Sequence, residues 1–436
     1  MGYLASWWRT GVGPSPPLPA SRLHGSSVVT DIDRRSFLAQ SAGFAAGMAL
    51  IPGLSAAMGR FSAPMKVGVV GCGRQGRAIV AELASFDNVT LAAICDIEPR
   101  RLNAGQRRAP DAKGYGSHRE MLDAGGLDAV FVATPTHLHR AVVEDTLAAG
   151  VNVYCEAPLA HTPEDAKAIA AAARSSGKVV QAGFLARANP VYQLARTFFV
   201  SDAVRTLAAM EATRARKTSW RTPARDAETE KLLNWRLNPE VSTGLAGEWG
   251  SHQFDVFHWY TDSYPTRVTG FGSVRLHEDG RTVDDTISST LQFPSGAALT
   301  YNATLGNSYE GMHEVFRGEN AAIKLAWSHG WMFKEADAPT QGWEVYANRQ
   351  QFHNDEGITL IAGATKLAEQ GKLKEGVGLP HTPLWYGVES FLKAVSEGAP
   401  VACTADEAAR STIVGIRAHE AITAGRTVEI DPTELG

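Results

Sequence analysis

The sequence has few cysteines and no long apolar run. Its four cysteines, spread over 436 residues, show no C-x-x-C spacing: Cys72, Cys95, Cys155 and Cys403. This pattern argues against a disulfide framework and against a cysteine metal site. Three of them lie in or beside apolar segments, so we predict small buried side chains. No apolar run reaches the roughly 20 residues that a membrane-spanning helix needs, so no membrane span is expected.

The chain also lacks an excess of charge of either sign. Its 42 Lys and Arg and 46 Asp and Glu residues give a formal net charge of −4, so nothing in its electrostatics points to nucleic acid. The composition, 44% hydrophobic and 20% charged, is that of a globular protein. Because a single hydrophobic core rarely serves so long a chain, we expect two domains.

What the sequence does contain is a glycine-rich turn between a strand and a helix. The apolar run 65–70 leads directly into G-x-G-x-x-G, and a helix is expected to follow. The first glycine permits the tight turn, the second lets the backbone approach a pyrophosphate, and the third lets helix and strand pack closely. The predicted cofactor contacts in this loop are Gly71, Gly73, Arg74, Gln75 and Gly76.

A carboxylate follows at the position that a dinucleotide site requires. The next apolar strand, 89–95, ends in Asp96, twenty residues after Gly76, where it can accept hydrogen bonds from ribose hydroxyls. A carboxylate there repels a 2′-phosphate and favours NAD. Arg100 and Arg101 follow closely, so NADP stays open. The alternative is an ordinary glycine turn with Asp96 as a surface cap.

The N-terminal segment predicts a targeting signal rather than part of a folded domain. Residues 1–30 are proline-rich and expected to be disordered, or to precede the true translation start near Val28 or Val29. Residues 31–59 resemble a Tat export signal, with twin arginines, a modest apolar stretch and small residues; the alternative is an amphipathic helix. Tat translocase would then be a partner during export to the periplasm. Since no nicotinamide pool exists there, the cofactor should be loaded beforehand and held tightly.

Residues 64–185 alternate strands and helices, which predicts a doubly wound parallel sheet, a Rossmann domain that binds the dinucleotide. Ligands bind at the carboxyl ends of such strands. One strand runs into A-T-P-T-H-L-H, and the next is followed by E-A-P. The candidate cofactor contacts in these two loops are Thr134, Pro135, His139 and Glu156.

The order G-x-G-x-x-G, terminal acid, A-T-P-x-x-x-H, E-x-P and Q-x-G-F resembles the Gfo/Idh/MocA family of nicotinamide-dependent sugar and polyol oxidoreductases, from about Lys66 to Ile430. The resemblance implies that the A-T-P loop flanks the cofactor and that Glu156 lies beside the nicotinamide ribose. One departure stands out. The family's usual motif is E-K-P, whose lysine holds and polarises the reacting carbinol, whereas this chain has Ala157. Either another group has taken over, or the chemistry differs from simple dehydrogenation.

Residues 186–430 predict an α+β domain for substrate binding and oligomerisation. Segments 267–275, 285–293 and 297–305 alternate apolar and polar side chains, as in a largely antiparallel open sheet with one wet face. That face is either the floor of a substrate cleft or a dimer surface, and we expect a homo-oligomer.

A helix beginning near Gly247 carries the predicted catalytic residues. Glu248 and His252 are four apart and share a helical face, which Asp255 extends. The imidazole would take a hydroxyl proton while the carboxylate fixes its tautomer. The resemblance implies the same, with Glu248 in place of the family's aspartate. The alternatives are a histidine hydrogen-bonded in the core or a metal chelate; since no second ligand pair accompanies it, we predict no metal.

Four tryptophans are expected near this site, where indole rings could stack on the apolar faces of a sugar: Trp220, Trp235, Trp249 and Trp259. The alternative is that they fill the core. Trp235 and its neighbour Arg236 are the candidate substrate contacts.

These features predict an exported, NAD-binding oxidoreductase that acts on a carbohydrate: a sugar, polyol or glycoside hydroxyl. Two alternatives stay open. A tightly held NAD could be used transiently in a redox-neutral glycoside hydrolase or lyase, or the chain could be a nucleotide-binding envelope protein without catalytic activity.

Overall fold

The structure, a computed structural model, describes residues 64–435 apart from 341–343, 345–346, 353–354, 363–366, 368–369 and 371–376. The predicted export signal and the region before it lie outside the described residues, as does most of a short helix expected over 361–369. No helix in the described part of the chain is long and apolar enough to cross a membrane.

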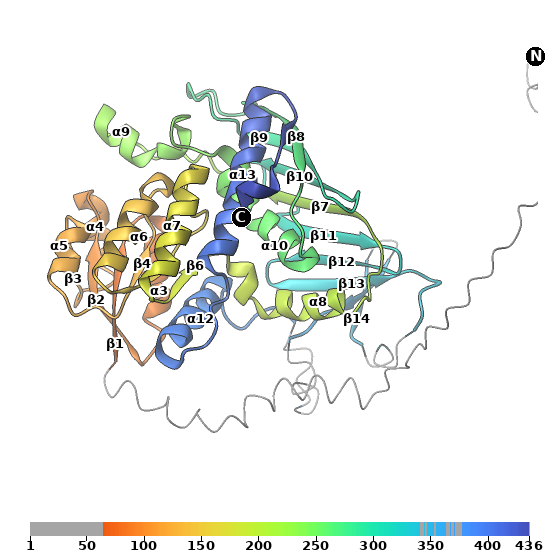
Figure 1. Cartoon of the computed structure of the whole chain (residues 1–436), viewed down its shortest axis with the longest axis horizontal. Helices are drawn as coiled ribbons and strands as arrows, with labels where there is room; N and C mark the ends of the chain where they lie inside the picture. Colours follow the sequence, from red (N-terminus) through yellow and green to blue (C-terminus); the bar gives the residue numbers. More distant parts are fainter. Residues whose placement is uncertain are drawn as a thin grey trace, which may run out of the picture. The chain divides into compact units, whose positions relative to one another are not determined.

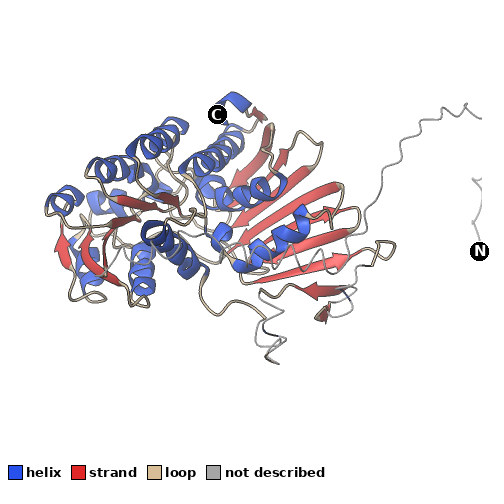
Figure 2. Ribbon diagram, turned by 60° about the horizontal axis from the view of Figure 1, so that its bottom comes forward, coloured by secondary structure: helices blue, strands red, loops and turns tan. Residues whose placement is uncertain are grey.

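The first domain is built on a six-stranded parallel sheet in the order β3-β2-β1-β4-β5-β6. Helices cover both of its faces (Figures 1 and 2). This confirms the predicted doubly wound fold. The strands are β1 (Met65–Val70), β2 (Val89–Cys95), β3 (Lys113–Tyr115), β4 (Ala129–Val132), β5 (Asn152–Cys155) and β6 (Val180–Ala182). The helices are α3 (Arg74–Leu83), α4 (Pro99–Gln106), α5 (His118–Asp123), α6 (His139–Ala148) and α7 (Pro163–Ser176).

The second domain is built on a ten-stranded sheet in the order β14-β15-β13-β12-β11-β7-β10-β9-β8-β16. Among the described strands of this second sheet, only the pair β7 and β10 is parallel, so the predicted, largely antiparallel sheet is confirmed. The strands are β7 (Leu207–Ala215), β8 (Arg267–Ser273), β9 (Thr286–Gln292), β10 (Ala298–Thr304), β11 (Met312–Gly318), β12 (Ala321–Ala326), β13 (His329–Lys334), β14 (Arg349–Gln351), β15 (Glu356–Thr359) and β16 (Val428–Glu429).

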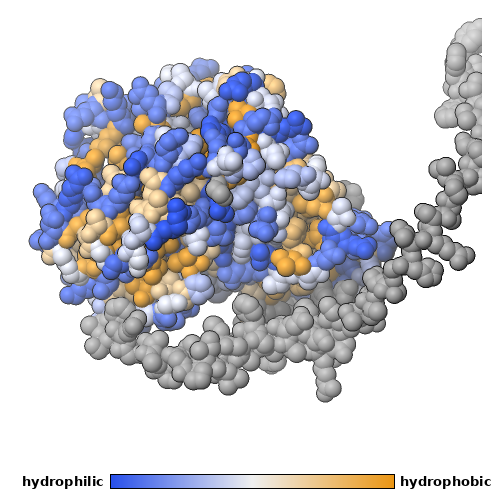
Figure 3. Space-filling view, viewed as in Figure 1, coloured by the Kyte–Doolittle hydropathy of each residue, from blue (hydrophilic) through white to orange (hydrophobic). Residues whose placement is uncertain are grey.

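The two faces of this sheet differ, as its alternating sequence requires. The inner face buries apolar side chains such as Leu291, Leu299 and Tyr301 against helices that include α8 (Pro190–Val200) and α10 (Ser251–Thr261). The outer face carries small polar side chains in register across β9 and β10, with Phe271 75% exposed beside them. The outside of the molecule also mixes hydrophilic and apolar residues (Figure 3).

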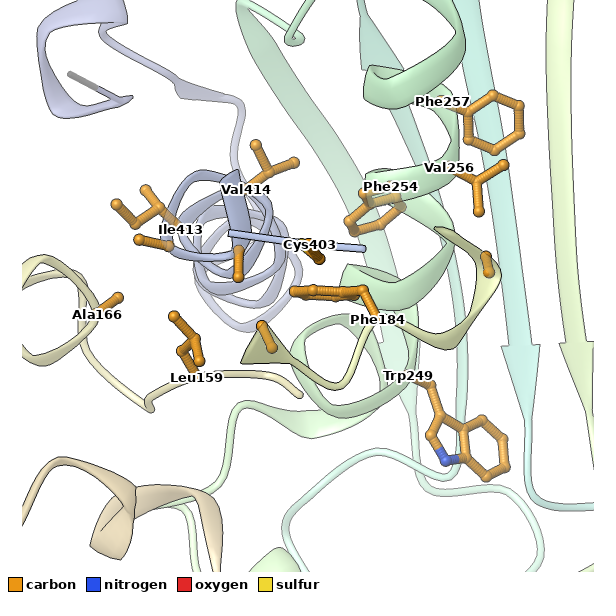
Figure 4. Packing of buried hydrophobic residues seen from close by; sticks show 14 of the residues in the cluster. Leu159, Ala166, Phe184, Trp249, Phe254, Val256, Phe257, Cys403, Ile413 and Val414 are labelled. Atoms are coloured by element: carbon orange, nitrogen blue, oxygen red, sulfur yellow. The ribbon is translucent and has the colours of Figure 1, made fainter. Parts of the chain in front are cut away.

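Two C-terminal helices join the sheets. Helix α13 (Ala405–Ala424) begins with a capping box between Thr404 and Glu407 and packs against both α7 and β8. Its Ile413 points toward Leu159 and Ala166 of the first domain (Figure 4).

Helix α12 (Pro383–Glu397) follows the second sheet in the chain but packs on the first. Its Phe391 lies edge-on to Phe131 and Tyr154 at ring distances of 5.2 and 5.7 Å. The apolar face of α12 therefore completes the core of the domain that begins the chain.

Candidate functional site

The glycine loop is shaped by backbone contacts. Gly71 has a φ of 96°, and a Cβ there would lie 2.5 Å from the carbonyl oxygen of Ala133. A Cβ on Gly76 would lie 1.7 Å from the oxygen of Gly71. Gly73, at the start of α3, is different, because a Cβ there would meet only Arg101 Nη1, at 3.9 Å. The loop is therefore closed where strand and helix meet and open where a diphosphate would approach the helix N-terminus.

Asp96 fastens this loop from the end of β2. Its Oδ2 accepts a hydrogen bond from the backbone N–H of Cys72 at 2.7 Å, and its Oδ1 accepts one from Glu98 at 2.8 Å. Asp96 is buried, and burial raises the pKa of its carboxyl. It is thus no surface cap. Each oxygen keeps a second lone pair that could accept from a ribose hydroxyl.

A cavity of about 550 Å³ opens beside Gly73. Its lining is strongly cationic, and most of the arginines come from α3 and α4 and the turns beside them: Arg74, Arg77, Arg100, Arg101, Arg107 and Arg108. The residues present therefore fit an adenine dinucleotide, whose diphosphate needs positive charge and open backbone amides.

A segment of the second domain roofs this cavity. Residues 216–234, here called the arm, leave the end of β7 and include α9 (Ala227–Leu233), which lies over the first domain (Figure 1). Thr222 and Arg225 of the arm line the cavity. The side chain of Asn234 accepts from the backbone N–H of Thr222 at 2.6 Å and donates to its carbonyl oxygen at 2.8 Å, which closes the arm into a loop.

At the other end of the loop, Gln75 reaches the predicted nicotinamide position. Its Nε2 donates to Glu156 Oε1 at 3.0 Å. Glu156 is buried at the end of β5, and this desolvation raises its pKa to about 7. The hydroxyl of Thr134 is buried without a hydrogen-bond partner among the described residues, and Pro135 is half-buried beside it. The Thr134 hydroxyl is therefore free to bond to a ligand.

His139 takes a different role from the one predicted. It is 1% exposed, and its ring nitrogens face the backbone oxygens of Thr134, at 3.0 Å, and Pro158, at 3.1 Å. Burial lowers its pKa to about 4. With both nitrogens occupied, His139 ties the two cofactor loops to each other and does not itself face a cofactor.

The imidazole of His252 lies at the carboxyl edge of the first sheet. The half-buried ring forms a hydrogen bond with the backbone of Ala157 and meets Phe184 edge-on at 5.4 Å. Burial lowers its pKa to about 3, and the cations Arg214 and Arg236 lower it further. His252 is therefore a neutral imidazole beside the turn where the family's lysine would stand. Its lowered pKa opposes the charged form, so a proton taken up by the ring would be held only transiently.

Glu248 does not orient His252, which corrects the prediction. Its carboxylate accepts from Thr136 at 3.1 Å, Thr243 at 3.2 Å and Arg236 at 3.1 Å, and no hydrogen bond to His252 occurs. The reason is local geometry. Residues Ala246–Gly250 form a π-helical turn before α10, and this wider turn breaks the i, i+4 alignment on which the prediction rested.

Asp255 also lies outside the site. It is fully buried, and its two oxygens accept from Arg187 at 2.8 and 2.9 Å and from Ser411 at 2.8 Å. Arg187 donates in turn to Glu407 at 2.6 Å. Asp255 is therefore part of a buried ion pair that joins α10 to α13, and the predicted catalytic role is wrong for want of access.

The candidate substrate contacts lie near His252. Trp235 is buried with its ring 5.8 Å from that of His137, and the guanidinium of Arg236 lies 4.2 Å from the Trp235 ring. Trp220 and Trp249 meet edge to face at 5.4 Å. Trp259 lies elsewhere, beside Arg187 and Arg196.

Three residues around Glu248 and His252 were not predicted as site residues from the sequence: Thr136, Thr243 and Arg214. The cationic run that begins at Arg214 was visible in the sequence, but the two threonines carry no signal there. No cluster of three or more His, Cys, Asp or Glu residues able to hold a metal occurs within the described ranges.

The comparison with known families decides the identity. A model described as an oxidoreductase family with an NAD-binding Rossmann fold matches residues 65–184, and the C-terminal domain model of the same family matches residues 207–324. The chain belongs to the Gfo/Idh/MocA family. It therefore pairs an NAD-binding domain with the family's own second domain, as the resemblance implied.

Individual relatives are distant. The myo-inositol 2-dehydrogenase of Thermotoga maritima is 24% identical over 369 residues, which cover 84% of this chain and 99% of that protein. A glycosyl hydrolase family 109 protein of Stenotrophomonas maltophilia is 33% identical over 143 residues, 30% of this chain and 31% of that one. The structure of levoglucosan dehydrogenase with NADH and L-sorbose superposes with a TM-score of 0.68 at 19% identity, over 85% of this chain and 99% of that one.

Proposed function

We propose that this member of the family holds its dinucleotide tightly and oxidises a hydroxyl-bearing carbon of a sugar, polyol or glycoside. The observation that carries the proposal is the neutral imidazole of His252 against the turn that follows Glu156. When bound, the nicotinamide ring accepts hydride. This chain's part is to bind and orient the reactants and to receive the hydroxyl proton at a ring nitrogen of His252.

The roles divide between the two domains. The open loop at Gly73 and the helix N-terminus behind it would hold the diphosphate, and Asp96 a ribose. Thr134 and Glu156 would lie at the nicotinamide end. In place of the missing lysine, an exposed cation that acts on the imidazole is Arg236, which Glu248 positions by their 3.1 Å ion pair.

The arm supports slow release of the cofactor. Since it roofs the adenosine end from the second domain, the dinucleotide cannot leave until the arm moves. Slow release fits the export that residues 31–59 predict, because a periplasmic enzyme would have to keep the cofactor with which it folded. The polar outer face of the second sheet is available for a homo-oligomer.

Two measurements test this proposal. Nucleotide released from the purified, denatured protein should have the mass and absorbance of NAD or NADH. The variant His252→Ala should keep that nucleotide and lose turnover by about 10²–10⁴-fold, the usual contribution of a general base. His118→Ala, which removes a histidine paired with Asp145 away from the site, is the matched control and should retain turnover. Turnover that survives in His252→Ala would contradict the assignment.

A second candidate is redox-neutral cleavage of a glycoside by transient oxidation. Two observations favour it: Ala157 in place of the lysine, and the similarity of 143 residues of this chain to a glycosyl hydrolase family 109 protein. Aryl glycosides separate the two reactions. Release of the phenol without accumulation of NADH indicates cleavage, and reduction of the cofactor without phenol indicates dehydrogenation. If neither cleavage nor dehydrogenation occurs with any sugar, the non-catalytic alternative is favoured.

A further inference from the structure

The wall beside His252 alternates guanidinium groups and indole rings. The Arg214 guanidinium lies 4.8 Å from the ring of Trp249 and donates to its carbonyl oxygen at 3.4 Å. Trp249 meets Trp220 edge to face, and Arg236 lies 5.9 Å from Trp220 and 4.2 Å from Trp235. We call these five residues the arginine–indole row.

The row has more positive charge than its carboxylates neutralise. Arg236 forms an ion pair with Glu248, whose side chain is 1% exposed. Neither Arg214 nor Arg216, two residues further along the chain, forms an ion pair with any acidic side chain of the described residues. The buried carboxyl of Glu314 attracts Arg214 without an ion-pair contact, and it is outnumbered by the guanidinium groups around it. Uncompensated buried cations are costly, so this arrangement favours an anionic ligand.

These cations act on one another and on the imidazole. Arg214 and Arg236 both lower the pKa of His252, and Arg216 and Arg236 both lower the pKa of Arg74. The four guanidinium groups therefore share one electrostatic neighbourhood around the proposed proton acceptor.

The cofactor accounts for only part of this charge. Arg74 is the first residue of α3 and lines the cavity at Gly73, where the diphosphate would lie. Arg214 and Arg216 belong instead to β7 and its end in the second domain, and Arg214 lies on the side of His252. Arg214 therefore remains for a group that reaches the site with the substrate. Arg216, the first residue of the arm, acts on both Arg74 and Arg214 and so lies between the two regions.

We propose that the substrate is an anionic saccharide, a sugar carboxylate of the uronate type, with its carboxylate on Arg214 and Arg216 and the apolar face of its ring on the indoles of the row. This rests on the proposed function, because it places the reacting hydroxyl at His252. A guanidinium matches a planar carboxylate with two parallel hydrogen bonds, and indoles match the C–H face of a pyranose.

Matched ligands test the proposal on the full-length protein with its cofactor. Methyl glucuronide, galacturonide and mannuronide differ from the corresponding methyl hexosides only in a carboxylate where these have CH₂OH. Calorimetry should show at least one uronide binding tenfold or more tighter than its neutral parent. Raising the NaCl concentration from 50 to 500 mM should weaken the uronide and leave the hexoside unchanged.

Variants locate the effect. Arg216→Gln alters an exposed side chain without an ion pair and should remove most of the uronide's advantage while leaving hexoside binding unchanged. Arg426→Gln is the charge-matched control, because it also removes one exposed arginine, here just after the end of α13. It should preserve the uronide's advantage. Equal loss in both variants would mean that net charge alone is responsible, and would overturn the proposed contact.

The outcomes separate this proposal from the function on which it rests. If each hexoside binds as tightly as its uronide, the proposal is overturned, and reduction of the cofactor by a hexoside would still support the proposed function. If a uronide binds tightly through Arg216 and neither reduces the cofactor nor is cleaved, the anion site stands and the proposed oxidation fails.

Discussion

In the first domain, backbone groups hold the site. The amide of Cys72 is fastened to Asp96 at 2.7 Å, and Gly71 touches Ala133 too closely for any side chain to intervene. In the second domain, side chains hold one another, as Glu248 does with Thr243 and Arg236. A site held by backbone groups can be predicted from the spacing and size of the residues. A site held by side chains depends on the directions in which they point, which a single wide helical turn can change. Seven substitutions test this comparison.

The largest effect is expected at the buried ion pair of Asp255. Asp255→Ala leaves Arg187 charged and buried without its bidentate partner, which typically costs about 3–5 kcal/mol of the free energy of unfolding. Thermal and denaturant unfolding would measure this loss. Turnover per folded molecule should change little. A variant of normal stability that is inactive would restore Asp255 to the catalytic machinery.

Both the success and the failure of sequence reasoning follow from this comparison. The prediction of β2 over 89–95 and of a carboxylate at its end was confirmed in position, because apolar periodicity and the twenty-residue spacing determine both. The start of α7 is set just as locally, since Thr162 accepts a hydrogen bond from the backbone N–H of Asp165 at 3.2 Å and a proline takes the first helical position. Local chemistry decides such features.

The misses have physical causes too. β3 has only three residues, too few for any periodicity, and α12 packs on the first domain although it follows the second in the chain. E-x-x-x-H was interpreted on an α-helical turn, but residues 246–250 make a π-helical one. His139 belongs to the A-T-P-x-x-x-H motif, but its ring bonds to backbone carbonyl oxygens and does not face a cofactor. None of these tertiary effects is written in the local sequence.

The second and third glycines of the loop should separate folding from binding. Gly76→Ala places a methyl group 1.7 Å from the oxygen of Gly71, so the turn must open, at a cost of about 1–3 kcal/mol and with loss of the bound nucleotide. Gly73→Ala meets nothing within 3.9 Å and should fold as well as the wild type, yet its methyl group fills the space of the diphosphate. Unfolding curves and the nucleotide content of both variants check this. Normal nucleotide content in Gly73→Ala would contradict the proposed cradle.

A smaller effect is expected at Glu248. Glu248→Gln keeps an oxygen for Thr136 and Thr243 but loses the ion pair with Arg236, so KM should rise about tenfold with kcat nearly unchanged. A carboxylate that oriented His252 would instead lower kcat by orders of magnitude when neutralised. Steady-state kinetics on the substrate that the holoenzyme oxidises distinguishes the two roles.

Asn234→Ala, which frees the arm, should leave both KM and kcat unchanged with NAD in excess and speed release of the cofactor.

The smallest effect compares one buried carboxyl from each domain. Burial raises the pKa of Glu156, and of Glu314 in β11, to about 7. A carboxyl that binds its proton more tightly when folded stabilises the fold fully below its ordinary pKa of 4.5, and that contribution is lost as the pH rises through 7. Between pH 6 and pH 8 each group should therefore cost about 1 kcal/mol of the free energy of unfolding.

Glu156→Gln and Glu314→Gln should each remove their own share of this pH dependence when unfolding is measured without cofactor. Added dinucleotide should change the contribution of Glu156, which is bonded to Gln75 of the glycine loop, and not that of Glu314, which is bonded to Tyr192 and Gln253 inside the second domain. If cofactor shifts both carboxyls alike, the two domains are coupled more tightly than their separate means of holding the site imply.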